Sequence, residues 1–101
     1  MLLGTVIKQL RERSGYSQSE LADKIQTIPS YIVCIEENKV IPPEKDLRNI
    51  GYALGVPYEL MFPLMCEISA IPESKKAVYR DLMHDIRKLI YNLIEPKKEY
   101  V

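Results

Sequence analysis

Residues 16–36 read YSQSELADKIQTIPSYIVCIE, and this stretch decides the fold. Ser17 and Glu20 form a Ser-x-x-Glu capping box, which is typical of a helix start. The apolar residues that follow recur at helical spacing. Pro29 suits the first turn of a further helix, because its missing N–H has no partner at that position in any case. The stretch therefore predicts two short helices joined by a tight turn.

The same reasoning extends in both directions along the chain. Val6, Ile7 and Leu10 recur at helical spacing, and Gly15 follows as a stop because glycine readily takes the left-handed conformation. Downstream, Asn38 is expected as a left-handed stop of the third helix, and Gly55 ends another amphipathic run in the same way. The capping box and the glycine stops predict an all-α fold. The expected helices are 5–14, 17–25, 29–37, 44–54, 58–62 and 73–94.

The last of these helices differs from the others in length and pattern. Ile71-Pro72 resembles a hinge, and Pro96 is expected to stop the helix before a frayed end. We therefore divide the chain into residues 1–68 and a C-terminal extension, residues 69–101. The apolar stripe is too broad to remain in water on a small monomer. Its expected dimerisation residues are Tyr79, Leu82, Met83, Ile86, Leu89, Ile90 and Leu93.

Two interpretations of that stripe remain open. A second chain could cover it through a two-fold interface, which is the interpretation we favour. The helix could instead fold back onto Met61, Phe62 and Leu64. Sedimentation of the full chain distinguishes the two.

Composition limits the classes of function. The 101 residues carry 14 basic and 14 acidic side chains, so any basic surface must come from an uneven distribution. Two cysteines and one histidine offer neither a disulfide framework nor a structural metal site. No signal peptide, membrane span, phosphate-binding loop or hydrolase motif is recognisable. We expect a cytoplasmic protein that is not an enzyme, with no cofactor and no evident small-molecule ligand.

A family resemblance makes this interpretation more specific. The run from Tyr16 to Ile25 resembles the x-S-Q-x-E-L-A-x-K-I signature of the XRE/Cro/C1-type, phage-repressor-like helix-turn-helix family. The run from Pro29 to Glu36 is similar to that family's P-S-Y-I-x-x-I-E segment, and the register continues to Leu60. The resemblance implies a compact five-helix domain, usually dimeric, that binds double-stranded operator DNA and regulates transcription.

The resemblance also implies roles for individual residues. Arg11 and Glu36 match a charged pair that links the first and third helices, which is a structural role. Lys24 would be a peripheral phosphate contact. The expected DNA-binding residues are Ser17, Gln18, Thr27, Pro29, Ser30, Tyr31, Val33, Cys34 and Lys39.

The sequence departs from the family inside the expected recognition helix. Cys34 stands where relatives often carry Arg, Lys or Gln, and Glu37 adds an acid near the DNA. Ile28 replaces the usual capping Ser or Thr, so Thr27 must cap the helix or the cap is missing. Residues 29–37 contain no Arg, Lys, Asn or Gln, the residue types that make most bidentate base contacts.

Two functions are therefore weighed. The first is a sequence-specific transcriptional regulator that acts as a homodimer on operator DNA. The second is a helix-turn-helix module that works mainly through a protein partner, antitoxin-like or anti-repressor, with weak DNA binding.

Overall fold

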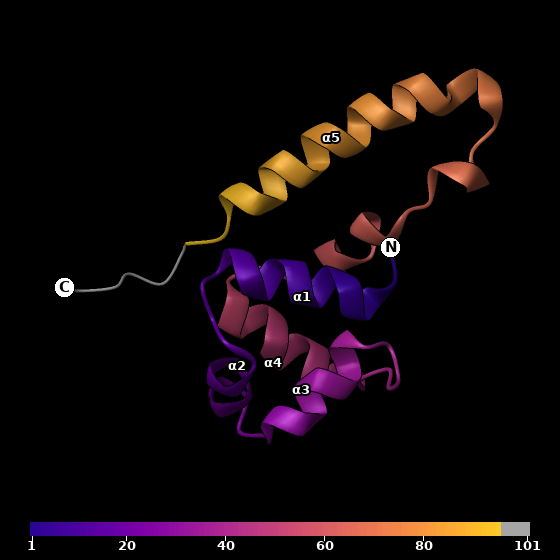
Figure 1. Ribbon diagram of the computed structural model, residues 1–101. Coiled ribbons are helices and arrows are strands. Elements are labelled where there is room, and N and C mark those ends of the chain that lie inside the picture. Colours follow the sequence, from indigo (N-terminus) through magenta and orange to yellow (C-terminus); the bar gives the residue numbers. More distant parts are fainter. Residues whose placement is uncertain (96–101) are drawn as a thin grey trace.

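The structure is a computed structural model that describes residues 1–95, and these residues form helices and no strand (Figure 1). The predicted all-α class is therefore confirmed. The α-helices are α1 (Leu3–Arg13), α2 (Gln18–Lys24), α3 (Pro29–Glu36), α4 (Glu44–Leu54) and α5 (Lys76–Asn92). Short 3-10 helices follow α4, namely η1 (Tyr58–Met61), η2 (Pro63–Met65), η3 (Ile68–Ala70) and η4 (Glu73–Lys75).

The helix boundaries lie within three residues of the expected ones. The first helix begins at Leu3, two residues early. The expected helix 58–62 is a 3-10 helix, η1, and Pro63, which lacks the N–H that a continuing α-helix needs, begins η2. Residues 73–75 form a separate 3-10 turn before α5. The expected stop at Pro96 and the frayed end lie outside the described residues.

Local signals account for most helix ends. In the capping box, the backbone N–H of Glu20 donates to Ser17 Oγ at 3.0 Å, and the N–H of Ser17 donates to Glu20 Oε1 at 3.1 Å. Gly15 and Gly55 take positive φ angles of 78° and 75°. Asn38, the expected left-handed stop of the third helix, has a φ of 60°. These four expectations from the sequence are confirmed.

Two residues in the motif show what the sequence left open. Gln26, in the turn between α2 and α3, adopts the left-handed conformation although it is not a glycine, with a φ of 59°. Ile28 is the N-cap of α3, and no side chain caps that helix. The first turn of α3 therefore keeps backbone N–H groups that no capping side chain occupies.

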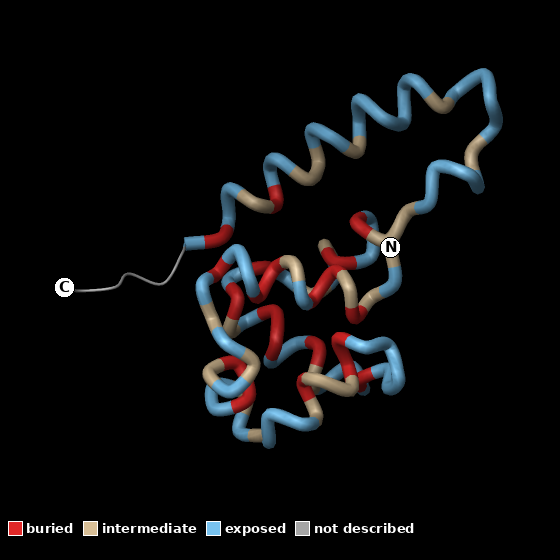
Figure 2. The backbone as a smooth tube through the Cα atoms, in the orientation of Figure 1, coloured by how far each residue is buried: buried red, intermediate tan, exposed pale blue. Residues whose placement is uncertain are grey.

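One hydrophobic core unites the helices. In Figure 2 the buried positions gather where α1 to α4 face one another and at the C-terminal end of α5, whereas most of α5 is exposed. The core residues are Val6, Ile7, Leu10, Leu21, Ala22, Ile32, Ile35, Leu47, Ile50, Leu54, Val56, Met61, Leu64, Ile90 and Ile94.

The C-terminal helix has two apolar faces. Ile90 and Ile94 belong to the core of their own chain, and Ile86 packs against it. Ile90, expected on the dimerisation face, is therefore already covered and cannot contact a second chain, because α5 folds back at this end. An adjacent face carries Leu82 and Leu89, which stay 49% and 66% exposed. The fold-back and the unpaired stripe thus coexist on one helix.

No helix within residues 1–95 is both long enough and apolar enough to cross a membrane.

Candidate nucleic-acid interface

The helices α2 and α3 form a compact pair joined by a tight turn. The N–H of Thr27 donates to the carbonyl of Ala22 at 2.9 Å and fixes the turn. Ile32 and Ile35 are fully buried and hold one side of α3 against the core. The opposite side of α3 therefore faces outward, on the far side of α1 from α5 (Figure 1).

The N-terminal end of α3 is the most accessible part of this surface. Pro29 and Ser30 are exposed, while Thr27, Val33 and Cys34 are half-buried. Within the described residues the Ser30 hydroxyl has no hydrogen-bond partner, so both its donor and its acceptor remain available. Ser30 is thus the polar side chain at the start of α3 that is best placed to meet a ligand.

Behind this surface lies a buried ion pair. Arg11 Nε donates to Glu36 Oε2 at 2.6 Å, and Arg11 Nη2 donates to Glu36 Oε1 at 2.9 Å. A third bond runs from Arg11 Nη1 to the carbonyl of Tyr16 at 2.8 Å. The hydrogen bond to Glu36 raises the pKa of Arg11, and burial opposes it more weakly. The pair ties α1 to both the start of α2 and the end of α3.

Gln18 is connected to the same pair. Its Nε2 donates to Glu36 Oε1 at 3.1 Å, and the side chain is half-buried. The amide that the family resemblance assigns to DNA contact therefore already has a partner inside the protein. The Ser17 cap is exposed at the start of α2, where helix N–H groups face outward.

Tyr31 is held by α4. Its hydroxyl donates to Asp46 Oδ2 at 2.5 Å. Burial, with the hydrogen bond to Asp46 and the carboxylate charge, raises the pKa of Tyr31 to about 12. The hydroxyl is therefore protonated near neutral pH, and its proton is engaged by Asp46 rather than free for a phosphate.

The cations near the surface also have partners. Lys39 Nζ lies 2.8 Å from Glu37 Oε2, and this contact raises the pKa of Lys39. Lys24 Nζ lies 4.9 Å from the centre of the Tyr16 ring. Both lysines are exposed, so an incoming phosphate can compete for them.

Sequence reasoning missed the partners of Gln18 and Tyr31. Glu36 lies 18 residues from Gln18, and Asp46 lies 15 residues from Tyr31. No spacing rule within a single helix relates such positions. Glu44 and Asp46 lie in the first turn of α4, where acidic residues favour the helix itself, so their presence does not indicate a partner for Tyr31.

The comparisons with known proteins agree with this geometry. A family model described as a helix-turn-helix domain matches residues 2–62. The chain belongs to this family. Among solved structures, the chain is similar to one from a complex of the SinR and SinI proteins, with 28% sequence identity and a TM-score of 0.57. The match covers 87% of this chain and 90% of the other. The sequence matched no curated protein.

These findings confirm the recognised helix-turn-helix fold and support a DNA-binding regulator rather than an enzyme. The family model ends at Phe62, so α5 lies outside it. The similar solved chain extends further, because the match with it covers most of both chains.

Proposed function

We propose that the protein is a sequence-specific transcriptional regulator that binds operator DNA as a homodimer. The observation that carries this proposal is the outward-facing start of α3, which follows the capped helix α2 in a helix-turn-helix domain. In such domains the second helix of the motif enters the major groove with its N-terminal side chains on base edges. A regulator of this kind works in the cytoplasm, where the operator lies.

The proposed DNA face has a small number of polar contacts. Ser30 is its base-reading side chain, since a hydroxyl bonds to several base edges. Val33 and the exposed Ile28 supply apolar contact with thymine methyl groups. Lys24 and Lys39 flank the face as phosphate contacts. Ser17, Gln18, Thr27, Pro29, Tyr31 and Cys34 complete the proposed set.

Two substitutions test this face. Lys39→Glu should weaken binding to all sequences alike and lower the slope of log affinity against log salt by about 1. Ser30→Ala should instead change the preferred sequence, because base contacts specify and phosphate contacts position. The measurement is a fluorescence-anisotropy titration against DNA selected from random fragments, at several salt concentrations.

Lys88→Gln is the matched control, since Lys88 is an exposed cation of α5 on the other side of α1. It should leave both affinity and preference unchanged. If Lys39→Glu and Ser30→Ala also bind as the native chain does, the proposed docking face is wrong.

The proposed dimer uses the exposed face of α5. Tyr79, Leu82, Leu89 and Leu93 remain 37%, 49%, 66% and 47% exposed. Together with Ile86 they follow a three-four spacing, which is the pattern of a helix that pairs with another helix. Burying one leucine contributes about 1.5–3 kcal/mol, so Leu82, Leu89 and Leu93 from each chain favour a stable pair. Met83, half-buried, borders this face.

A charge placed on that face should prevent pairing. We expect Leu89→Lys to be a monomer in sedimentation equilibrium at concentrations where the native chain is a dimer, with unchanged helix content by circular dichroism. Lys88→Gln again serves as the control and should remain dimeric. A native chain that is monomeric at high micromolar concentration would rule out the homodimer.

A second candidate function rests on two observations. The recognition helix carries no Arg, Lys, Asn or Gln. The similar solved chain comes from a complex of the SinR protein with the SinI protein. A helical protein partner could cover the face of α5 in place of a second copy. The salt titration separates the two candidates, because the protein-binding module would show little salt-dependent DNA binding.

A further inference from the structure

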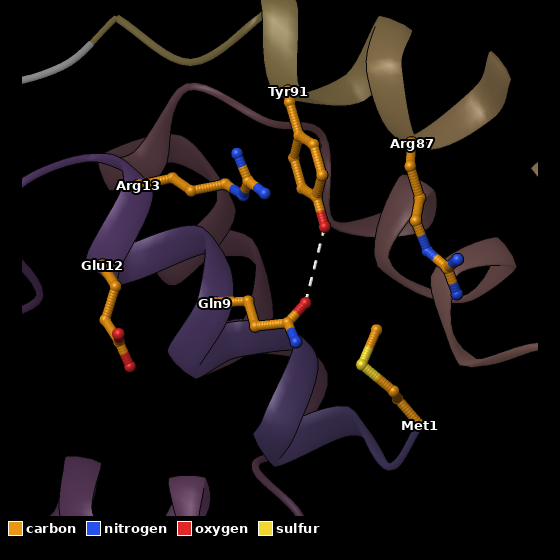
Figure 3. Close-up of a pocket in the computed structure, with 6 residues that line it drawn as sticks. All are labelled: Met1, Gln9, Glu12, Arg13, Arg87 and Tyr91. Atoms are coloured by element: carbon orange, nitrogen blue, oxygen red, sulfur yellow. Dashed lines mark hydrogen bonds between the residues drawn. The ribbon is translucent and has the colours of Figure 1, made fainter. Parts of the chain in front are cut away.

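A cleft of about 680 Å³ lies between α1 and α5. In Figure 1, α1 stands between α5 and the α2–α3 pair, so this cleft and the α3 surface lie on different sides of α1. Figure 3 shows its walls, which combine charged, aromatic and amide side chains. The lining residues are Met1, Gln9, Glu12, Arg13, Arg87 and Tyr91.

Two arginines from different helices line this cleft, one on each side of Tyr91 (Figure 3). Arg13 comes from α1, and its Cζ lies 3.7 Å from the centre of the Tyr91 ring. Arg87 comes from α5, on the opposite side of Tyr91 (Figure 3). Within residues 1–95, neither guanidinium forms an ion pair with a carboxylate. Glu12 is the carboxylate in the lining, so the two arginines leave the cleft with a net positive charge.

Of the two arginines, Arg87 gives the stronger indication of a bound ligand. Its Nε is buried and has no hydrogen-bond partner among the described residues. A buried donor without a partner is unfavourable and rare in folded proteins, so each case calls for a physical explanation. A bound group with acceptor oxygens would satisfy this donor.

The remaining wall consists of Tyr91, Gln9, Met1 and one carboxylate, Glu12. Tyr91 donates its hydroxyl hydrogen to Gln9 Oε1 at 3.4 Å, which holds the ring upright between the helices. The Glu12 side chain lies on α1 and is turned away from Tyr91 (Figure 3). The amine of Met1 already donates to the carbonyl of Met65 and to Glu67, so these partners satisfy it without a ligand in the cleft.

A neighbouring hollow adds to the positive charge. Arg87 also lines a second cleft, which includes Arg80 and His84 from the same helix. The acidic side chain in that lining is Glu67, which pairs with the amine of Met1. Arg80 and Arg87 therefore place two positive charges along the edge of α5 that lines this second cleft.

We propose that the cleft between α1 and α5 binds a small anionic molecule through Arg13 and Arg87. The recognised chemistry is a phosphate or carboxylate group, because the planar guanidinium presents paired N–H donors that match these oxygens. The volume lies within the range of sites for metabolite-sized ligands. Operator DNA on α3 cannot be the ligand, since the cleft opens on the other side of α1.

Occupancy of this cleft would fix α5. A ligand held by one arginine from each helix binds best when α5 is docked, and by linkage it favours the docked arrangement. On the proposed function, α5 also carries the dimer face, so the anion would influence assembly. That consequence rests on the proposed dimer, whereas the binding itself does not.

The test titrates the full-length protein with inorganic phosphate and, separately, with citrate, while following arginine and backbone signals by NMR. Potassium chloride at equal ionic strength is the reference. We expect saturable shifts at Arg13 and Arg87 with at least one anion, and the two arms show whether phosphate or carboxylate is preferred. Arg87→Gln should weaken that binding by about tenfold or more, because a charge-assisted bond is lost.

Three variants keep the result decisive. Lys88→Gln, next in sequence but outside the cleft, should bind as the native chain does. Arg13→Gln should weaken binding independently of any effect that Arg87→Gln has on folding. Arg87→Lys keeps the positive charge but lacks the paired N–H donors of the guanidinium. It should therefore bind more tightly than Arg87→Gln and more weakly than the native chain. Shifts that match potassium chloride, or native affinity in both glutamine variants, would overturn the proposal whether or not the protein binds DNA.

Discussion

Replacing Glu36 with alanine will lower the free energy of unfolding by about 3–5 kcal/mol. The carboxylate accepts two bonds from Arg11 and one from Gln18, and the two charged side chains are only 10% and 3% exposed. The variant leaves the Arg11 charge buried without its partner, which is the costly situation for an ion pair. Urea unfolding followed by circular dichroism measures the loss.

An exposed pair provides the control. Glu73 pairs with Lys76 at 3.0 Å and is 86% exposed, so Glu73→Ala should change stability by less than about 1 kcal/mol. The double variant Arg11→Met/Glu36→Leu should recover most of the loss, because well-packed apolar side chains can replace a buried pair. A loss below about 1 kcal/mol in Glu36→Ala would show that water solvates this pair in solution.

Replacing Gly4 with alanine will destabilise the protein by about 1–3 kcal/mol, although alanine is the better helix former. Helix propensity alone predicts a gain of about 1 kcal/mol at this position. A Cβ on Gly4 would lie 2.0 Å from the carbonyl oxygen of Ile35 and 2.6 Å from Asn38 Oδ1. The backbone of α3 must move to accommodate it, and the 2.9 Å bond from the Gly4 N–H to Asn38 Oδ1 is lost.

Lys8→Ala, at an exposed position of the same helix, separates propensity from packing. It should change the free energy of unfolding by less than about 0.5 kcal/mol. Thermal and urea unfolding of the two variants give the comparison. A stabilised Gly4→Ala variant would mean that α1 and α3 lie further apart than the structure shows.

The starts and stops of the helices were predictable because their causes are local. A capping box acts over three residues, and a left-handed stop depends on the residue that adopts it. Ser17, Gly15, Asn38 and Gly55 therefore behave as the sequence predicts. The family resemblance added the relative placement of these helices, and the match over residues 2–62 agrees with it.

The proposed site was predictable only as a set of positions. The sequence placed Gln18, Ser30 and Tyr31 at the start of the motif. It could not show that Gln18 donates to Glu36 or that Tyr31 donates to Asp46. Because of these two bonds, Ser30 is the one of the three side chains that has no hydrogen-bond partner among the described residues. Such pairings depend on how α2, α3 and α4 pack, and no periodicity encodes them.

The C-terminal helix best separates the features that can be predicted from the sequence from those that depend on tertiary packing. The three-four spacing of its apolar residues determined that α5 is amphipathic, because that property belongs to one helix alone. The spacing could not determine which residues the rest of the chain covers. Tertiary packing buries Ile90 and leaves Leu89 exposed, since only the side of α5 that faces α1 has a surface to contact. The same packing brings Arg13 and Arg87, 74 positions apart in the sequence, to one cleft.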